Sequence, residues 1–191
     1  LSYLRHIPNI VVMAPKDEAE LARMMVTALD HDGPCAVRYP RGTGVGAKVS
    51  DNPRRIAIGK GELVRDGADA LVITIGSRVY PAIEAAMELE KSGPDAAVFN
   101  ARFVKPLPEK QLLELAARFG RILIVEENAL AGGFGSAVLE LFNAAGVLAD
   151  KRVQCLGIPD AFVEHGTQKE LRALLGIDKN GIKRALRKLC K

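Results

Sequence analysis

The sequence has no tryptophan, few histidines and cysteines, and no apolar run near the ~20 residues that a membrane-spanning helix needs. Its three cysteines have neither CxxC nor Cys/His ligand spacing, which argues against a zinc site and favours free thiols in a cytosolic protein. An initiating methionine is also missing, and the first residues open inside a pattern. We therefore expect the chain to be a piece of a longer protein, with the 48% hydrophobic and 26% charged composition of a soluble globular fold.

Positive charge is not spread along the chain but gathered at its C-terminal end. Residues 179–191 hold six basic residues and no acidic one, whereas the whole chain has a net charge of +4, so the remainder is slightly acidic. Within this segment Ile182, Leu186 and Leu189 form an i, i+4, i+7 apolar stripe. This pattern predicts an amphipathic helix docked on the domain with a solvated basic face. No aromatic platform accompanies the charges, so we expect no nucleic-acid partner, and the lack of a long apolar run predicts no membrane partner.

The N-terminal part of the chain predicts a strand–helix–strand unit. Residues 9–15 (NIVVMAP) are a short apolar run ended by proline, and residues 35–39 (CAVRY) are a second one. Between them, Asp17 and Glu20 have capping-box spacing at the start of a helix that reaches about Leu29. Two parallel strands and one helix cannot bury both faces of a sheet. The unit therefore needs more sheet than these residues provide.

Glycines, a proline and scattered charges without periodicity follow, which predicts a linker and a domain boundary. We place an incomplete first domain at 1–47, a linker at 48–55 and a second domain at 56–191. The second domain alternates strands with helices, and runs such as LVITI and ILIV are apolar on both faces. This is typical of an open, mostly parallel five-stranded α/β sheet flanked by helices. Its strands are expected in the segments KGELVRDG, ALVITIG, AAVFN, RILIVEE and RVQCLGI, and the first two are close enough to include an antiparallel pair.

Arg41 is the main candidate for a functional residue. It lies in AVRYPRGTGVG, just beyond a predicted strand, and ligands of open α/β sheets bind beyond the carboxyl ends of strands. The planar guanidinium matches the oxygens of a phosphate or carboxylate in a bidentate way. Pro40 ends the strand, and the glycines that follow allow a backbone to approach a ligand closely. From the residues alone, a ligand-binding arginine and an ordinary surface-loop arginine are both open.

Other candidates favour structural roles. Residues 132–136 (GGFGS) join a strand to a helix but lack the full G-x-G-x-x-G pattern, so a tight turn with close packing is favoured over a phosphate cradle. Glu126 and Glu127 are consecutive strand residues that point to opposite faces, so they cannot share a substrate, and at least one should cap a helix or serve an interface. No nucleophile lies at motif spacing from the three histidines, His6, His31 and His165, which we interpret as polar loop residues.

Several segments together resemble a known family. They occur in the order and at the intervals of 1-deoxy-D-xylulose-5-phosphate synthases, which are thiamine-diphosphate-dependent transferases of the transketolase superfamily. The segments are LSYLRHIPNIVVMAPKDEAEL, GPCAVRYPRG, NARFVKPLP, VEENALAGGFGSAV and GIPDAFVEHGTQKEL. YPRG or GGFGS alone would not separate this family from transketolases or from the β subunits of 2-oxo-acid dehydrogenases. IPNIVVMAPKDEAEL and ARFVKPLP favour the synthases.

The resemblance implies a cytoplasmic homodimeric enzyme that condenses pyruvate with glyceraldehyde 3-phosphate, releases carbon dioxide, and feeds isoprenoid and thiamine biosynthesis. Residues 1–47 would end its pyrimidine-binding domain, and residues 56–191 would be its C-terminal domain, chiefly a packing and dimer-stabilising element. Arg41 matches the arginine that grips the phosphate of the aldehyde substrate. The family's catalytic residues, and its ligands for thiamine diphosphate and Mg²⁺, lie outside this chain. The chain alone is therefore predicted to be inactive.

Two alternatives remain at this point. The chain could belong to another enzyme of the superfamily, either a transketolase or a 2-oxo-acid dehydrogenase β-type subunit. It could also be a non-catalytic nucleotide-binding or regulatory module that uses GGFGS.

Overall fold

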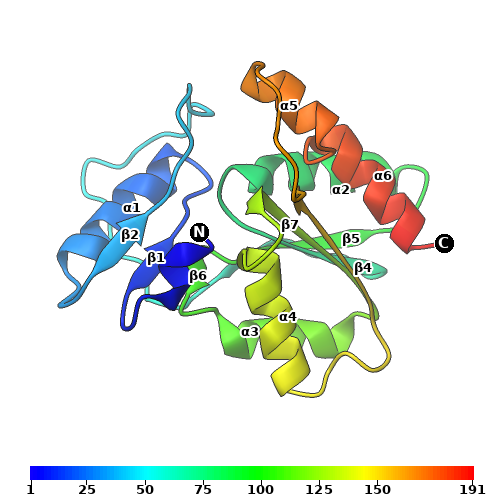
Figure 1. The fold of residues 1–191 in the computed structure, drawn as a ribbon, viewed down its shortest axis with the longest axis horizontal. Helices are drawn as coiled ribbons and strands as arrows, with labels where there is room; N and C mark the ends of the chain where they lie inside the picture. Colours follow the sequence, from blue (N-terminus) through cyan, green and yellow to red (C-terminus); the bar gives the residue numbers. More distant parts are fainter.

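The computed structural model describes residues 1–191, which are organised around two sheets (Figure 1). The smaller sheet has the strand order β2-β1-β6 and is formed by β1 (Val11–Met13), β2 (Cys35–Val37) and β6 (Phe103–Lys105). β1 and β2 are parallel and are connected through α1 (Glu18–Leu29), as the strand–helix–strand pattern predicts. A 3-10 turn, η1 (Tyr3–His6), precedes them.

The larger sheet has the order β3-β5-β4-β7-β8, and its strands are parallel except for β3. This confirms the predicted open, mostly parallel five-stranded sheet. The suggested antiparallel pairing of the first two strands is wrong in its partner: β3 runs antiparallel to β5, not to β4, because β5 lies between them. The strands are β3 (Glu62–Arg65), β4 (Ala70–Thr74), β5 (Ala96–Asn100), β7 (Arg121–Ala129) and β8 (Arg152–Ile158).

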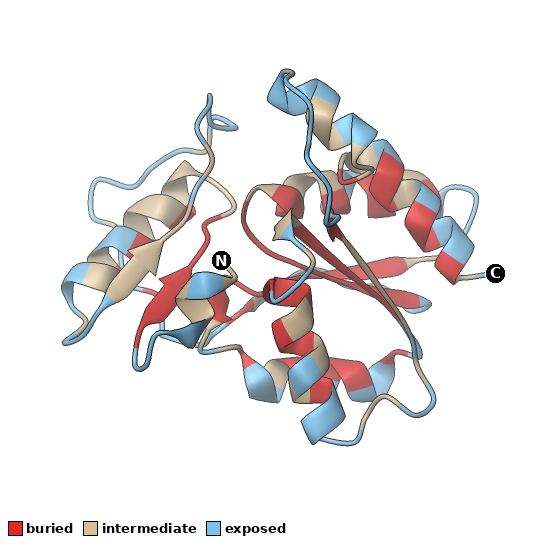
Figure 2. Cartoon of the chain, in the orientation of Figure 1, coloured by how far each residue is buried: buried red, intermediate tan, exposed pale blue.

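Helices cover both faces of the larger sheet (Figures 1 and 2). One face carries α2 (Val79–Glu90) and α6 (Lys179–Leu189), and the other carries α3 (Glu109–Arg118) and α4 (Phe134–Ala144). A short turn, η2 (Gly76–Arg78), leads from β4 into α2, and α5 (Gln168–Leu174) precedes α6. The apolar stripe of α6 is buried against α2 and the sheet, which confirms the docked helix with a basic outer face. None of the helices is long and apolar enough to span a membrane.

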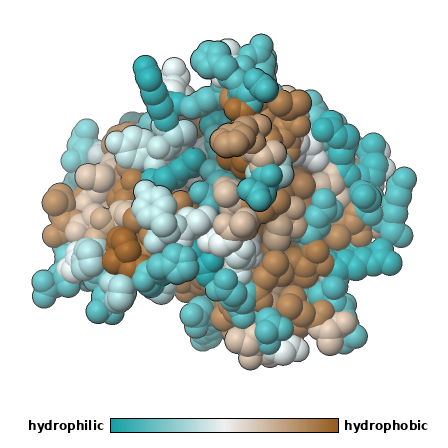
Figure 3. All heavy atoms as spheres, in the orientation of Figure 1, coloured by the Kyte–Doolittle hydropathy of each residue, from teal (hydrophilic) through white to brown (hydrophobic).

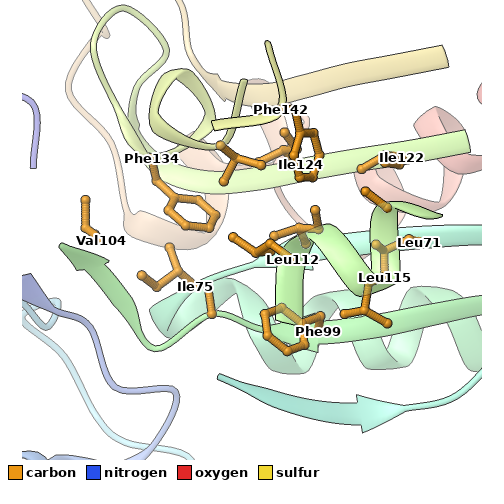
Figure 4. Close-up of a cluster of buried hydrophobic side chains, with 14 of the residues drawn as sticks. Leu71, Ile75, Phe99, Val104, Leu112, Leu115, Ile122, Ile124, Phe134 and Phe142 are labelled. Carbon is orange, nitrogen blue, oxygen red and sulfur yellow. The ribbon is translucent and has the colours of Figure 1, made fainter. Parts of the chain in front are cut away.

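Alternate residues of each strand enter two separate cores, since successive strand side chains point to opposite faces. Leu71 and Ile122 pack with α3 and α4, whereas their neighbours Val72 and Leu123 pack with α2 and α6. The first core continues into the smaller sheet. There Val104, on β6, lies at the end of the cluster beside Phe134 and Ile75 (Figure 4).

β6 was not predicted, and it explains how the N-terminal unit obtains its missing sheet. The strand belongs to the second part of the sequence but pairs antiparallel with β1, with Val12 opposite Lys105 and Met13 opposite Phe103. One face of β1 then joins the large core, and the other packs with α1 through Met13, Met24 and Phe103. No helix or strand occurs in residues 38–61, the stretch that includes the predicted linker.

A buried ionic network fastens α1 to the end of β5. Glu20 is 2% exposed, and its carboxylate accepts hydrogen bonds from Asn100 Nδ2 at 3.1 Å and from Arg102 Nε at 2.7 Å. Lys16 Nζ also donates to Glu20, at 3.1 Å, and both Lys16 and Arg102 reach Glu62. Burial acts to lower the pKa of Lys16, but Glu20 and Glu62 outweigh it and raise the pKa. A buried carboxylate is tolerable here because cations and an amide satisfy it.

Arg102→Met should lower the free energy of unfolding by about 3–5 kcal/mol, because it leaves the buried Glu20 carboxylate without its closest cation. Urea denaturation measures the change. Arg118→Met is the matched control, since Arg118 is 51% exposed and pairs with an exposed aspartate. Its effect should stay below about 1 kcal/mol. Equal losses in the two variants would contradict the importance of the network.

Candidate functional site

A cleft of about 540 Å³ separates the N-terminal unit from the larger sheet. One wall is the loop after β2, residues 39–45, together with the start of α1. The opposite wall is η2, the first turn of α2 and one side of α5. In the space-filling view the rim between the two units is largely hydrophilic (Figure 3). The cleft therefore suits a polar ligand.

Arg41 lines this cleft from the loop that follows β2, as its position beyond a predicted strand indicates. Its side chain is exposed, and its guanidinium makes no hydrogen bond or ion pair within the chain. Only its carbonyl oxygen is engaged, by the amide of Gln168 on α5. A guanidinium with no internal partner keeps its donors available for an anionic ligand.

The Arg41 loop is shaped by glycines and held by Glu18. The Glu18 carboxylate accepts hydrogen bonds from the backbone N–H groups of Gly46 at 2.8 Å and Ala47 at 3.3 Å. Backbone hydrogen bonds lower the pKa of Glu18 accordingly. A Cβ at Gly44 would lie 1.9 Å from Glu18 Oε1, so no larger residue fits there without displacing the carboxylate. The glycines thus serve the loop's attachment to α1.

Glu127 organises the opposite wall. Arg172 on α5 binds it in a bidentate way, with Nε and Nη2 both at 3.0 Å from its carboxylate oxygens, and Ser77 Oγ donates to it at 2.6 Å. Burial acts to raise the pKa of Glu127, but Arg172 and Ser77 outweigh it and the pKa is lowered. Arg78 Nε lies 3.2 Å from Glu127 Oε2, and burial lowers the pKa of Arg78 to about 10. Glu127 therefore joins the end of β7 to η2 and α5.

Asp17 and Tyr80 connect the two walls at the base of the cleft. Asp17 Oδ1 caps α1 by accepting from the Glu20 N–H at 2.7 Å, and its Oδ2 accepts from the Tyr80 hydroxyl at 2.8 Å. Burial, together with the Asp17 carboxylate, raises the pKa of Tyr80 to about 12. The phenol is therefore a neutral donor at physiological pH, and the contact helps to set the distance between α1 and α2.

The GGFGS segment does not contribute to the cleft. The Glu126 carboxylate accepts from the N–H groups of Phe134 at 2.8 Å and Gly135 at 2.7 Å, the first residues of α4. A carboxylate thus occupies the helix N-terminus where a phosphate would otherwise bind. A Cβ at Gly133 would lie 2.4 Å from Glu126 Oε2, which explains the glycine. These contacts favour the turn-and-packing interpretation of GGFGS and oppose the nucleotide-binding one.

The remaining candidates do not join Arg41. None of the three histidines lines the cleft, and no three His, Cys, Asp or Glu side chains are grouped so that they could hold a metal ion. Gln168, Glu18 and Arg172 were not predicted as site residues, because they meet the Arg41 loop or its surroundings only through long-range folding. A weak signal existed: Gln168 and Arg172 lie four residues apart, on one face of a capped helix.

Two family models match the chain. The model for the transketolase C-terminal domain matches residues 59–182, and the model for the transketolase pyrimidine-binding domain matches residues 1–44. Residues from both matched segments line the cleft.

Among curated proteins the chain is similar to enzymes named 1-deoxy-D-xylulose-5-phosphate synthase. It is 52% identical over 190 residues to that of Nitratidesulfovibrio vulgaris, covering 99% of this chain and 30% of the relative. It is 56% identical over 187 residues to that of Oleidesulfovibrio alaskensis, covering 97% and 29%. Synthase 1 of Geobacter metallireducens is 53% identical over 191 residues, covering 100% and 30%. The chain thus spans about 30% of the length of these relatives.

Solved structures agree on the fold. A split-gene transketolase, described as an inactive tetramer of four beta chains, superimposes with a TM-score of 0.86 at 28% identity. The match covers 100% of this chain and 61% of the transketolase chain. A transketolase from Campylobacter jejuni gives a TM-score of 0.67 at 21% identity, covering 97% and 27%, and supports the fold alone.

The cap that Glu126 forms at the start of α4 can be tested through the pH dependence of stability. Burial raises its pKa in the folded protein above the ordinary 4.5, against the opposing effect of the two N–H donors. The folded protein then binds the proton more tightly than the unfolded chain, so stability is lost as pH rises through the raised pKa. We expect the unfolding free energy of wild type, relative to Glu126→Gln, to fall in urea denaturation as the pH rises above the ordinary pKa of 4.5 and through the raised pKa of the folded protein. Glu114→Gln, at an exposed carboxylate on α3, supplies the baseline; a wild-type advantage that grows with pH would contradict the assignment.

Proposed function

Because this chain belongs to the transketolase family, we propose that it forms the C-terminal portion of a 1-deoxy-D-xylulose-5-phosphate synthase. Such an enzyme joins a two-carbon unit of pyruvate to glyceraldehyde 3-phosphate and releases the third pyruvate carbon as carbon dioxide. The product would feed isoprenoid and thiamine biosynthesis in the cytoplasm. The identity of 52–56% over nearly the whole chain supports this choice over a transketolase, which the solved neighbour matches at 28%.

The free guanidinium of Arg41 in the cleft is the observation that supports a phosphate-bearing substrate. It presents a guanidinium with no internal partner from a glycine-rich loop beyond a strand end, in a polar cleft. We assign it to the phosphate of glyceraldehyde 3-phosphate, whose oxygens its planar fork can hold in a bidentate way. Its role is to bind and orient the aldehyde substrate. Pyruvate has no phosphate for it to hold.

Thiamine diphosphate and Mg²⁺ would be bound by residues outside 1–191, because this chain has no metal-ligand cluster and its glycine loop is closed by Glu126. When bound, the cofactor supplies the carbanion chemistry of the two-carbon transfer. Residues 1–47 would complete the pyrimidine-binding domain, and residues 56–191 would stabilise the enzyme and its homodimer. The tetramer of the structurally similar split-gene transketolase supports self-association of chains with this architecture.

Arg41→Ala in the full-length protein should raise the KM for glyceraldehyde 3-phosphate by about 10- to 100-fold, the equivalent of losing a charge-assisted contact of about 1.5–3 kcal/mol. The KM for pyruvate should change less than about twofold. Steady-state kinetics with each substrate varied in turn measure both values. Arg55→Ala, at an exposed arginine outside the cleft, is the matched control. A larger increase in the KM for pyruvate than in the KM for glyceraldehyde 3-phosphate would contradict the assignment of Arg41.

Residues 1–191 expressed alone should show no synthase activity, because the chain would lack the groups that hold and activate thiamine diphosphate. The inactive neighbour of the same architecture supports this expectation. The measurement is release of labelled carbon dioxide from pyruvate in the presence of glyceraldehyde 3-phosphate, thiamine diphosphate and Mg²⁺. The full-length protein is the positive control. Turnover by the isolated chain would show that it carries its own cofactor site.

A further inference from the structure

α5 is distant in sequence from the Arg41 loop but lies beside it in the fold (Figure 1). The Gln168 amide nitrogen donates a hydrogen bond to the carbonyl oxygen of Arg41. The same amide lies against the next residue: a Cβ at Gly42 would be 3.4 Å from Gln168 Oε1, and Gly42 has a φ of +149° that other residues rarely adopt. Gln168 thus holds the Arg41–Gly42 peptide and leaves the guanidinium free.

The helix that carries Gln168 is itself fixed. Thr167 and Glu170 form a capping box at its start, and Arg172 pairs with Glu127 one turn further on. The carbonyl oxygen of the same Glu127 accepts a hydrogen bond from Arg38 Nη2 at 3.0 Å. The segment from Arg38 to Arg41 is therefore tied at both ends to the C-terminal part of the chain, by Glu127 at one end and by Gln168 at the other.

We propose that Gln168 is a positioning residue, which holds the Arg41 loop from α5 so that the guanidinium is presented to the phosphate of the substrate. The C-terminal domain then has a role in substrate affinity besides packing. The inference rests on the proposed function of Arg41, but the hold on the loop itself can be tested separately.

Limited proteolysis of the full-length protein tests the hold on the loop without any assay of activity. Trypsin cleaves after arginine, and the Arg41 carbonyl that Gln168 binds belongs to the scissile bond. Gln168→Met keeps the length of the side chain but removes the donor. Cleavage between Arg41 and Gly42, followed by mass spectrometry, should become about 3- to 10-fold faster, as expected for the loss of one neutral hydrogen bond.

The matched control is Lys169→Met, the same replacement at the next position of α5, where the side chain is exposed and outside the cleft. It should leave the cleavage rate at Arg41 unchanged. Equal rates in all three proteins, or equal acceleration in both variants, would overturn the proposal that Gln168 holds the loop.

Kinetics then test the consequence for the substrate. Gln168→Met should raise the KM for glyceraldehyde 3-phosphate by about 3- to 10-fold, with kcat and the KM for pyruvate unchanged. In an Arg41→Ala background the same replacement should have no further effect, since Gln168 acts only through Arg41. Additive effects, or a loss of kcat alone, would overturn the positioning role. If wild type fails to convert pyruvate and glyceraldehyde 3-phosphate, the proposed function fails, whereas the proteolysis result still decides whether Gln168 holds the loop.

Discussion

The arrangement of the two units depends on one buried carboxylate. Glu20, on α1, is held by Arg102, Asn100 and Lys16, and no other buried charge joins elements of both units so directly. A carboxylate in such surroundings is stable only while its partners stay in place, so the network acts as an orientation constraint rather than as a simple attraction. The cleft, with the Arg41 loop in one of its walls, and the contact between Asp17 and Tyr80 lie between the two units that this constraint orients. Their geometry follows from it.

Glu126 and Glu127 show how one strand end serves both structure and site. The two side chains leave β7 on opposite faces, as the alternation of strand residues requires. Glu126 closes the first turn of α4, which removes that helix end as a binding site for phosphate. Glu127 points to the other side, where it orders Ser77, Arg78 and Arg172 along the wall of the cleft. Anion binding is thus suppressed at one glycine-rich loop and left open at the other.

Local patterns in the sequence predicted most of the fold. The five-stranded sheet, the buried stripe of α6 and the β1–α1–β2 unit follow from periodicities and spacings within single elements. β6 was not predicted because it has only three residues, next to Pro106, and because its partner β1 lies about ninety residues earlier in the chain. The position of Arg41 beyond a strand was predictable. Its contact with Gln168 was not, since no local spacing reports which distant helix lies beside a loop.

The pairing of β6 with the N-terminal sheet limits how this protein can be divided. The strand belongs to the C-terminal part of the sequence, yet it completes the edge of the N-terminal sheet and closes the core under α1. A copy of residues 56–191 would carry a strand without a partner, and the preceding unit would expose the unpaired edge of β1, a surface that templates aggregation. The two units are therefore not interchangeable modules. Recombination between related genes at the linker would succeed only where both sides of the β1–β6 pair had changed together.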